Sequence, residues 1–146
     1  MLKDLSPKVF TKVYQALGVV PLSKANCPPY VWPLHGIVNK KTRRVFVSVP
    51  VSHDNKDPVN VVFLVDTGST ATYLAQETLD VLCGEDMPIP KKTKARLNGL
   101  ETTVFLSPKK TRLDGLNLLG MDYLAQHKCH LYVDGRTRKC SIDRCK

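Results

Sequence analysis

The chain has 146 residues, enough for one domain with a hydrophobic core, and its 42% hydrophobic and 24% charged residues are ordinary for a soluble globule. No stretch approaches the roughly 18 apolar residues of a membrane-spanning helix, so we expect no membrane partner. The net charge of +9 raises nucleic acid as a partner, but basic residues spread over segments 40–44, 91–96 and 109–112 favour an ordinary solvated surface.

An intracellular location is expected from the N-terminus and the cysteines. Charges interrupt residues 1–22, which therefore do not resemble a secretory leader. The odd count of five cysteines favours reduced thiols, as in the cytoplasm or nucleus.

The first predicted element is a helix that begins after Ser6. Ser6 suits the N-cap position, Pro7 the first helical position, and Gly18 the C-cap, with apolar residues at helical spacing between them. A Pro-rich segment over residues 21–33 follows and is typical of a linker or an extended arm.

Strands are predicted next. Valines alternate over residues 45–51, and the apolar run 59–65 is short enough for a buried strand that ends on Asp66. A short helix is expected around residues 75–82. Asn98-Gly99 favours a two-residue type I′ turn, with Arg96 facing Glu101 across the hairpin.

Residues 116–120 predict a short buried strand, and 121–127 a helical turn with Asp122 near its start. A second hairpin is expected around Asp134-Gly135; a two-residue turn there would place Cys129 opposite Cys140. The chain is therefore predicted to be mainly β with two or three short helices.

The Asp66-Thr67-Gly68 sequence could carry hydrolytic chemistry. In an aspartyl hydrolase two close carboxylates share one proton; the ionised member draws a proton from water while the protonated one polarises the scissile carbonyl. Gly68 permits a close backbone approach, and Thr67 and Ser69 supply hydroxyl groups. On its own the tripeptide is more often an ordinary strand exit, but a second apolar strand ending in Gly120 makes the catalytic interpretation stronger.

The segments FLVDTGST and LNLLGMDYLAQHKCHLYV together resemble the retropepsin family, the aspartic proteases of retroviruses and retrotransposons and their cellular relatives. The second segment is similar to the protease domain of DNA-damage-inducible proteins. The resemblance covers roughly residues 36–142. It implies a small closed β-barrel per subunit with short helices, so we expect an N-terminal helix and Pro-rich arm over 1–34 and a protease domain over 35–146.

The resemblance also implies site roles. Asp66 would be the catalytic acid and base, with a polypeptide as substrate and no cofactor. The catalytic loop would be supported by Thr67, Gly68, Ser69, Leu118, Leu119 and Gly120. Because the chain has no second Asp-Thr-Gly or Asp-Ser-Gly, it supplies half a dyad, and a twofold homodimer is the simplest completion.

The pattern departs from the family between the two anchors. The family covers its substrate with a Gly-rich hairpin flap, but this interval is short. Either the hairpin Leu97, Asn98, Gly99 and Leu100 is a compact flap, or it matches the barrel hairpin behind the flap and residues 84–93 are a vestigial cover. Met121 and Thr70 stand where many viral members have Arg and Asp, which indicates a differently stabilised interface.

Other residue sets give weaker hypotheses. Cys129, His130, Cys140 and Cys145 match no common zinc spacing, so no metal site is expected. Trp32 is expected to pack on the barrel or on a partner subunit.

The principal hypothesis is a homodimeric aspartic endopeptidase. The alternative is a catalytically weak or inactive dimerisation or binding module of the same fold, with a mobile-element polyprotein as one origin considered. A third hypothesis is nucleic-acid binding by the basic surface.

Overall fold

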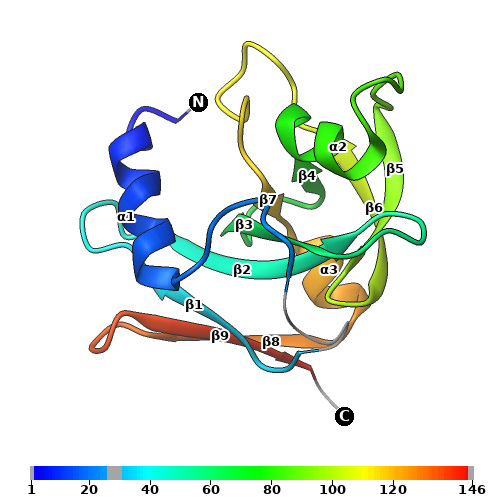
Figure 1. Cartoon of the computed structure of the whole chain (residues 1–146). Coiled ribbons are helices and arrows are strands. Elements are labelled where there is room, and N and C mark those ends of the chain that lie inside the picture. Colours follow the sequence, from blue (N-terminus) through cyan, green and yellow to red (C-terminus); the bar gives the residue numbers. More distant parts are fainter. Residues whose placement is uncertain (1, 26–30, 145–146) are drawn as a thin grey trace.

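The computed structural model describes residues 2–25 and 31–144 and shows a mainly β chain (Figure 1). Its helices are α1 (Pro7–Leu17), α2 (Gln76–Cys83) and α3 (Met121–Gln126). Its strands are β1 (Leu34–Val38), β2 (Val45–Ser52), β3 (Val59–Val65), β4 (Thr72–Leu74), β5 (Lys92–Leu97), β6 (Leu100–Leu106), β7 (Leu118–Leu119), β8 (Cys129–Asp134) and β9 (Lys139–Arg144).

Six of these strands close into a small barrel. Their order is β3-β7-β4-β6-β5-β2, and the antiparallel pairing of β2 with β3 closes the ring. The fold class expected from the sequence, a small closed β-barrel with short helices and an N-terminal helix, is confirmed. Closure matters for the site because it fixes the end of β3 beside the end of β7.

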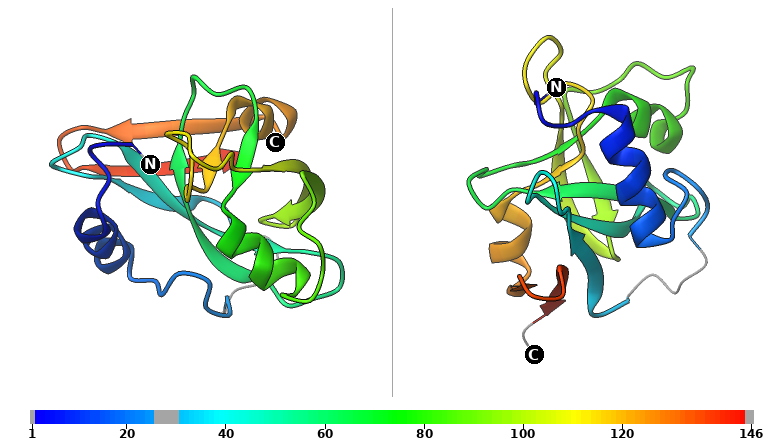
Figure 2. Two further views of the ribbon diagram at one scale, coloured as in Figure 1. Left: turned by 90° about the horizontal axis from the view of Figure 1, so that it is seen from above. Right: turned by 90° about the vertical axis from the view of Figure 1, so that its left-hand side faces the viewer.

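Three strands extend the sheet beyond the barrel. β1 pairs with the first half of β2, β9 pairs with β1, and β8 lies outermost on β9 (Figure 2). Within the described residues β8 therefore has one unpaired edge. An open strand edge of this kind is a ready template for pairing with another chain.

The barrel interior follows the predicted alternation along β2. Val47, Val49 and Val51 are fully buried with Phe63 of β3 in the main core. Each such side chain contributes about 1.5–3 kcal/mol through removal of apolar surface from water. The period-two pattern of the sequence thus assigned the inward face of β2 correctly.

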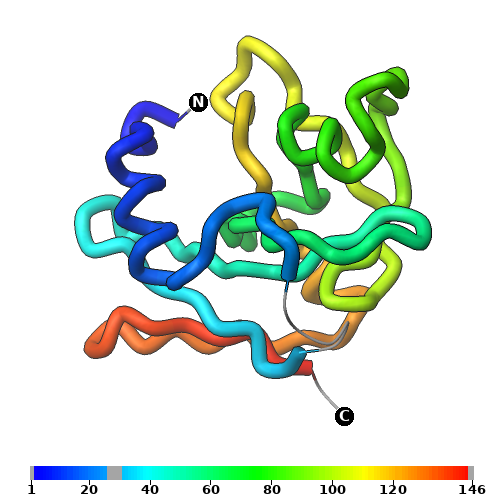
Figure 3. The backbone as a smooth tube through the Cα atoms, in the orientation of Figure 1, coloured from blue at the N-terminus to red at the C-terminus, as the bar shows by residue number. Residues whose placement is uncertain are grey.

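Helix α1 packs on the outside of the barrel and forms a second core. The Ser6 side chain accepts the Val9 N–H, and Gly18 ends the helix in the left-handed conformation (φ 69°), as predicted. Val9 and Val13 pack with Phe46 and its neighbours. Figure 3 shows the chain leaving this helix and running back along the barrel.

The Pro-rich segment is not a free linker where it is described. Leu22 N–H donates to Asn60 O and Ala25 N–H to Pro58 O, so this part of the segment runs beside the start of β3. Trp32 packs against the barrel core, in agreement with one of its two expected positions. Residues 26–30 of the predicted arm lie outside the described residues.

The first hairpin has its predicted turn. Asn98 (φ 51°) and Gly99 (φ 80°) both have the positive φ of a type I′ turn, and Arg96 is aligned with Glu101. The ion pair of Glu101, however, is with Lys94 (3.3 Å), on the diagonal.

The second hairpin differs from its prediction. Asp134 pairs with Lys139, so the turn has four residues rather than two, and Cys140 faces Val133 instead of Cys129. The Asp134 carboxylate accepts the N–H groups of Arg136 and Thr137, which stabilises the longer turn. The predicted Cys129–Cys140 alignment is therefore wrong.

The predicted helices at 75–82 and 121–127 are present as α2 and α3. Among the described residues, no helix is long and apolar enough to cross a membrane.

Candidate active site

Asp66 is the residue directly after β3, and backbone bonds fix its loop. Its N–H donates to Leu119 O (2.9 Å), and its own carbonyl accepts the Ser69 N–H (3.1 Å). The Asp66 Oδ1 atom accepts the Gly68 N–H (2.9 Å), while Oδ2 has no hydrogen bond within the described part of the chain. Asp66 is half-buried, and its loop holds one carboxylate oxygen in place.

Thr67 and Gly68 form the exposed tip of this loop, and Ser69 turns inward. The Ser69 hydroxyl donates to Ala71 O (2.8 Å). A Cβ at position 68 would lie 3.2 Å from Asp66 Oδ1, closer than most Cβ contacts. A glycine there lets the backbone N–H approach the carboxylate.

The second sequence anchor lies directly beside the first. β7 is parallel to β3, with Leu64 aligned with Leu118 and Val65 with Leu119. Gly120 then passes so close to the loop that a Cβ would meet Ala71 O at 2.2 Å. Met121 N–H donates to Ser69 O (2.8 Å). The structure therefore brings Leu118, Leu119 and Gly120 behind the Asp66 loop.

Two further residues, Thr72 and Asp122, connect these segments and were not assigned from the sequence. The fully buried Thr72 hydroxyl donates to Asp122 Oδ1 (2.7 Å) and accepts the Gly120 N–H (3.1 Å). Asp122 Oδ2 also accepts the Thr72 N–H (3.1 Å). The sequence signal that could have identified Asp122 is its position as an acidic residue in the first turn of the helix after Leu118-Leu119-Gly120.

Asn117 makes a similar connection on the far side of β7. Its Oδ1 accepts the Ala75 N–H and the Thr78 hydroxyl, both at 2.9 Å, and its carbonyl accepts the Leu64 N–H. It thereby fixes the start of α2 relative to β3.

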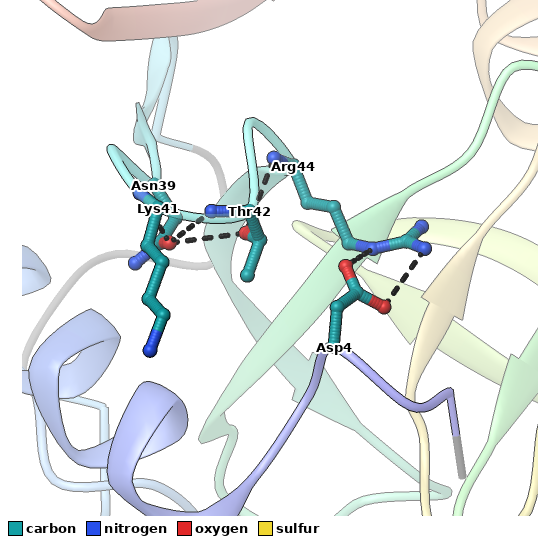
Figure 4. Close-up of polar contacts among 5 residues, drawn as sticks. All are labelled: Asp4, Asn39, Lys41, Thr42 and Arg44. Atoms are coloured by element: carbon teal, nitrogen blue, oxygen red, sulfur yellow. Dashed lines mark hydrogen bonds and ion pairs between the residues drawn. The ribbon is translucent and has the colours of Figure 1, made fainter.

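Arg44 is a positively charged residue near the end of β3 that is followed by Asp66. Its guanidinium makes a two-pronged contact with Asp4, Nε to Oδ2 at 2.6 Å and Nη2 to Oδ1 at 3.1 Å (Figure 4). The hydrogen bond to Asp4 is the main cause of the raised pKa of Arg44, and the charge of Asp66 raises this pKa further by a smaller amount. The N-terminal segment is thus linked electrostatically to the Asp66 region.

The candidate flap residues are not brought to Asp66. Asn98 is fully buried; its N–H donates to Pro50 O, and its side chain is bonded to both backbone groups of Val31. Pro50 is aligned with Asn60, six residues before Asp66 and about 20 Å away along an extended strand. Leu97 and Leu100 are barrel strand residues, so the structure favours the second alignment, a hairpin of the barrel wall.

The segment assigned to a vestigial cover, residues 84–93, leaves α2 and enters β5. It is largely exposed, and Met87 has 61% of its surface accessible. It is a short connection between α2 and β5 and contains no hairpin of its own among the described residues.

The cysteines and histidines do not gather into a metal site in the described residues, where no group of three His, Cys, Asp or Glu side chains is suited to a metal ion. Cys129 and Cys140 are free thiols, and burial raises the pKa of Cys140 to about 11. Cys145, a member of the four-residue set considered for zinc, lies outside the described residues.

Comparison with known proteins adds a likeness to solved structures. No protein-family profile matches the chain, and no curated protein matches its sequence. Among solved structures, a retropepsin-like aspartic protease from Rickettsia conorii is similar at 18% sequence identity and a TM-score of 0.49. The alignment covers 79% of this chain and 96% of that one.

Proposed function

We propose that the chain is one subunit of a homodimeric aspartic endopeptidase. In this dimer two Asp66 carboxylates activate a water that hydrolyses a peptide bond. The observation that carries the proposal is the Asp66 loop, whose carboxylate is oriented by the Gly68 N–H and whose backbone is bonded to β7. A hydrolase needs this rigidity, because a misplaced carboxylate loses most of its effect on the bound water.

The proposed chemistry needs no cofactor. Two carboxylates within hydrogen-bonding distance share one proton. The ionised member takes a proton from the water, the water oxygen attacks the carbonyl carbon, and the protonated member donates to the carbonyl oxygen. The tetrahedral intermediate then collapses: a proton passes from the carboxyl pair to the amide nitrogen, the C–N bond breaks, and the amine and the new carboxylic acid leave. Asp66 is the acid and base, while Thr67 and Gly68 at the exposed loop tip would contact the partner loop.

A second copy is required because the other Asp-Gly pairs serve turns. Asp134 Oδ1 accepts two backbone N–H groups of its own hairpin. Asp114 Oδ2 accepts the Lys110 N–H. Neither carboxylate is delivered by a buried strand, so the twin of Asp66 would come from the partner in a twofold dimer.

The edge of β8 is the surface on which we place the dimer contact. β8 is the outermost strand, and its Val133 is 51% exposed. Pairing with the same edge of a second copy would satisfy the open backbone groups of both strands.

The test is peptide cleavage by wild type and Asp66→Asn between about pH 4 and 7, where a shared-proton pair is expected to work. Asp57→Asn is the matched control, because Asp57 is an exposed turn residue paired with Lys24. We expect Asp66→Asn to abolish cleavage and Asp57→Asn to leave it unchanged. Equal rates for wild type and Asp66→Asn would end the enzyme proposal.

A second candidate is a dimerisation or binding module with little turnover. It is favoured by the position of the Asn98-Gly99 hairpin, which is fixed in the barrel wall and leaves only the short segment 84–93 as a cover. A site without a cover sequesters its water poorly. Stable dimers and a bound folded partner, with no cleavage at any pH and no effect of Asp66→Asn, would favour this candidate.

A further inference from the structure

A groove of about 710 Å³ is lined by residues of α1, β1 and the turns that follow β1 and β8. It is formed where α1, the turn after β1 and the turn after β8 meet, and Figure 1 shows these three segments together on one side of the molecule. Its floor is Ala16, Ile37 and Val38. Its charged lining residues are Lys12, Lys40, Lys41 and Arg138.

The two turns that carry these cations are held in fixed conformations. Asn39 Oδ1 accepts the N–H groups of Lys41 and Thr42 and the Thr42 hydroxyl, as Figure 4 shows. Arg138 O accepts the Val38 N–H (2.9 Å), which joins the second turn directly to the first. The backbone positions of the charges are thus set before any ligand arrives, which lowers the entropic cost of binding.

Within the described part of the chain, no ion pair neutralises the groove cations. Within residues 2–25 and 31–144, the ion pairs of lysine and arginine are Lys24–Asp57, Arg44–Asp4 and Lys94–Glu101, and none involves a groove residue. Among the described residues the acidic side chains of the neighbouring hairpin, Asp134 and Asp143, form no ion pair with a groove cation, and the four groove cations outnumber these two carboxylates. The groove therefore presents a net positive field to solvent.

The exposed rings of His130 and Tyr132 lie on the same face of the sheet as the groove residue Ile37. Paired residues of antiparallel strands point to the same face, and the face alternates along each strand. Ile37 is aligned with Lys139, and two residues further along β9 Ser141 is aligned with Tyr132. His130 is stacked on Tyr132 with ring centroids 5.9 Å apart and 25° between the planes, and Tyr132 is 58% exposed.

We propose that this surface, the groove with Lys12, Lys40, Lys41 and Arg138 together with the His130–Tyr132 pair, binds single-stranded nucleic acid. Lysine and arginine would contact the phosphates, and Tyr132 would stack on a base. An exposed ring pair beside cations on a sheet face distinguishes this partner from an acidic peptide or an anionic membrane, because neither of those requires a flat stacking surface. The site is separate from Asp66 and independent of the proposed hydrolysis.

The probe is a fluorescein-labelled oligouridylate of about 20 nucleotides, long enough for the groove and the ring pair together, followed by fluorescence anisotropy. The groove variant is Lys12→Gln, Lys41→Gln and Arg138→Gln. The matched control, Lys91→Gln, Lys109→Gln and Arg112→Gln, removes the same charge from exposed loops elsewhere. Tyr132→Ala and Tyr132→Phe test the ring, and Asp66→Asn tests independence from the candidate active site. Circular dichroism checks that each variant is folded.

Between about 50 and 200 mM salt, wild-type affinity should fall steeply, and the groove variant should show a log–log slope shallower by up to about 2, since each lost phosphate contact removes about 0.7. Its binding should be at least about ten-fold weaker, while the control and Asp66→Asn should bind like wild type. Tyr132→Ala should weaken binding several-fold and Tyr132→Phe should retain it.

Three results would each overturn the proposal. One is an equal loss of affinity in the groove and control variants, which would mean that net charge alone binds the probe. Another is no effect of Tyr132→Ala. The third is equally tight binding of a polyglutamate peptide or of phosphatidylserine vesicles, which would assign the groove to an acidic peptide or a membrane surface.

Discussion

Replacing Gly120 by alanine tests whether the close approach of the two sequence anchors is as tight as the structure indicates. The added Cβ would lie 2.2 Å from Ala71 O, 2.7 Å from Ala71 C and 3.0 Å from Ser69 O. An ordinary carbon–oxygen contact is about 3.3 Å or longer, so the backbone of the Asp66 loop must move by about 1 Å. The obstructing atoms are backbone atoms, which cannot rotate away as a side chain would.

Overpacking of this kind costs about 3 kcal/mol, at the upper end of the usual range. At about 2–4 °C per kcal/mol for a domain near this size, the midpoint of thermal unfolding should fall by roughly 6–12 °C. The displaced loop also carries Asp66, so peptide cleavage by folded Gly120→Ala should be lost well below the unfolding temperature.

Gly135→Ala is the control, because a Cβ at that exposed turn meets no atom of the described residues within 4 Å. Its stability should stay within about 0.5 kcal/mol of wild type. The assay is thermal unfolding followed by circular dichroism, with urea unfolding as a second measure. If Gly120→Ala unfolds at the same temperature as Gly135→Ala, the apposition of Gly120 and the Asp66 loop described above is wrong.

Three other changes probe the framework of the site. Thr72→Val should lower the free energy of unfolding by about 2–3 kcal/mol, because the half-buried Asp122 carboxylate and the buried Gly120 N–H lose a partner, whereas Thr72→Ser should retain most stability in urea unfolding; equal losses would contradict the role of the hydroxyl. Asp4→Asn should destabilise the chain at neutral pH. The Arg44 hydrogen bond chiefly lowers the Asp4 pKa below 3.8, so this contribution is present above that pH and lost as pH falls through the lowered value; a difference between wild type and variant that does not shrink as the pH is lowered below 3.8 would refute it. Val133→Lys on the β8 edge should shift the proposed dimer toward monomer in sedimentation. Val20→Lys, at a 70% exposed position distant in sequence from β8, should leave the dimer unchanged. Identical behaviour of the two variants would place the interface elsewhere.

Much of the barrel was predictable because its strands carry strong local signals. The valines of β2 alternate, the apolar run of β3 ends at Asp66, and Asn98-Gly99 specifies its own turn. β4 was missed because its Thr72, Tyr73 and Leu74 are too few for a visible period. The turn after β8 was predicted too short because Asp134 stabilises a longer turn through its side chain, an alternative that Asp-Gly alone does not reveal.

The two sequence anchors of the candidate site could be predicted from local sequence, but the side-chain contacts that connect them could not. Asp66 and Gly120 stand out by local sequence, and their apposition follows from two short apolar strands in a closed sheet. The contact of Thr72 with Asp122 joins residues 50 positions apart and has no local signature. The placement of the Asn98-Gly99 hairpin was equally hidden, since a barrel hairpin and a flap share the same turn chemistry.

The most direct test of the central claim is a subunit-mixing measurement of peptide cleavage. Wild-type and Asp66→Asn chains are mixed in varying ratios at constant total concentration and allowed to exchange before the rate is measured. If each active site needs one Asp66 from each of two chains, the rate falls with the square of the wild-type fraction, to about one quarter in an equal mixture. A rate that falls in simple proportion, to about one half, would mean that each chain acts alone and would contradict the shared site.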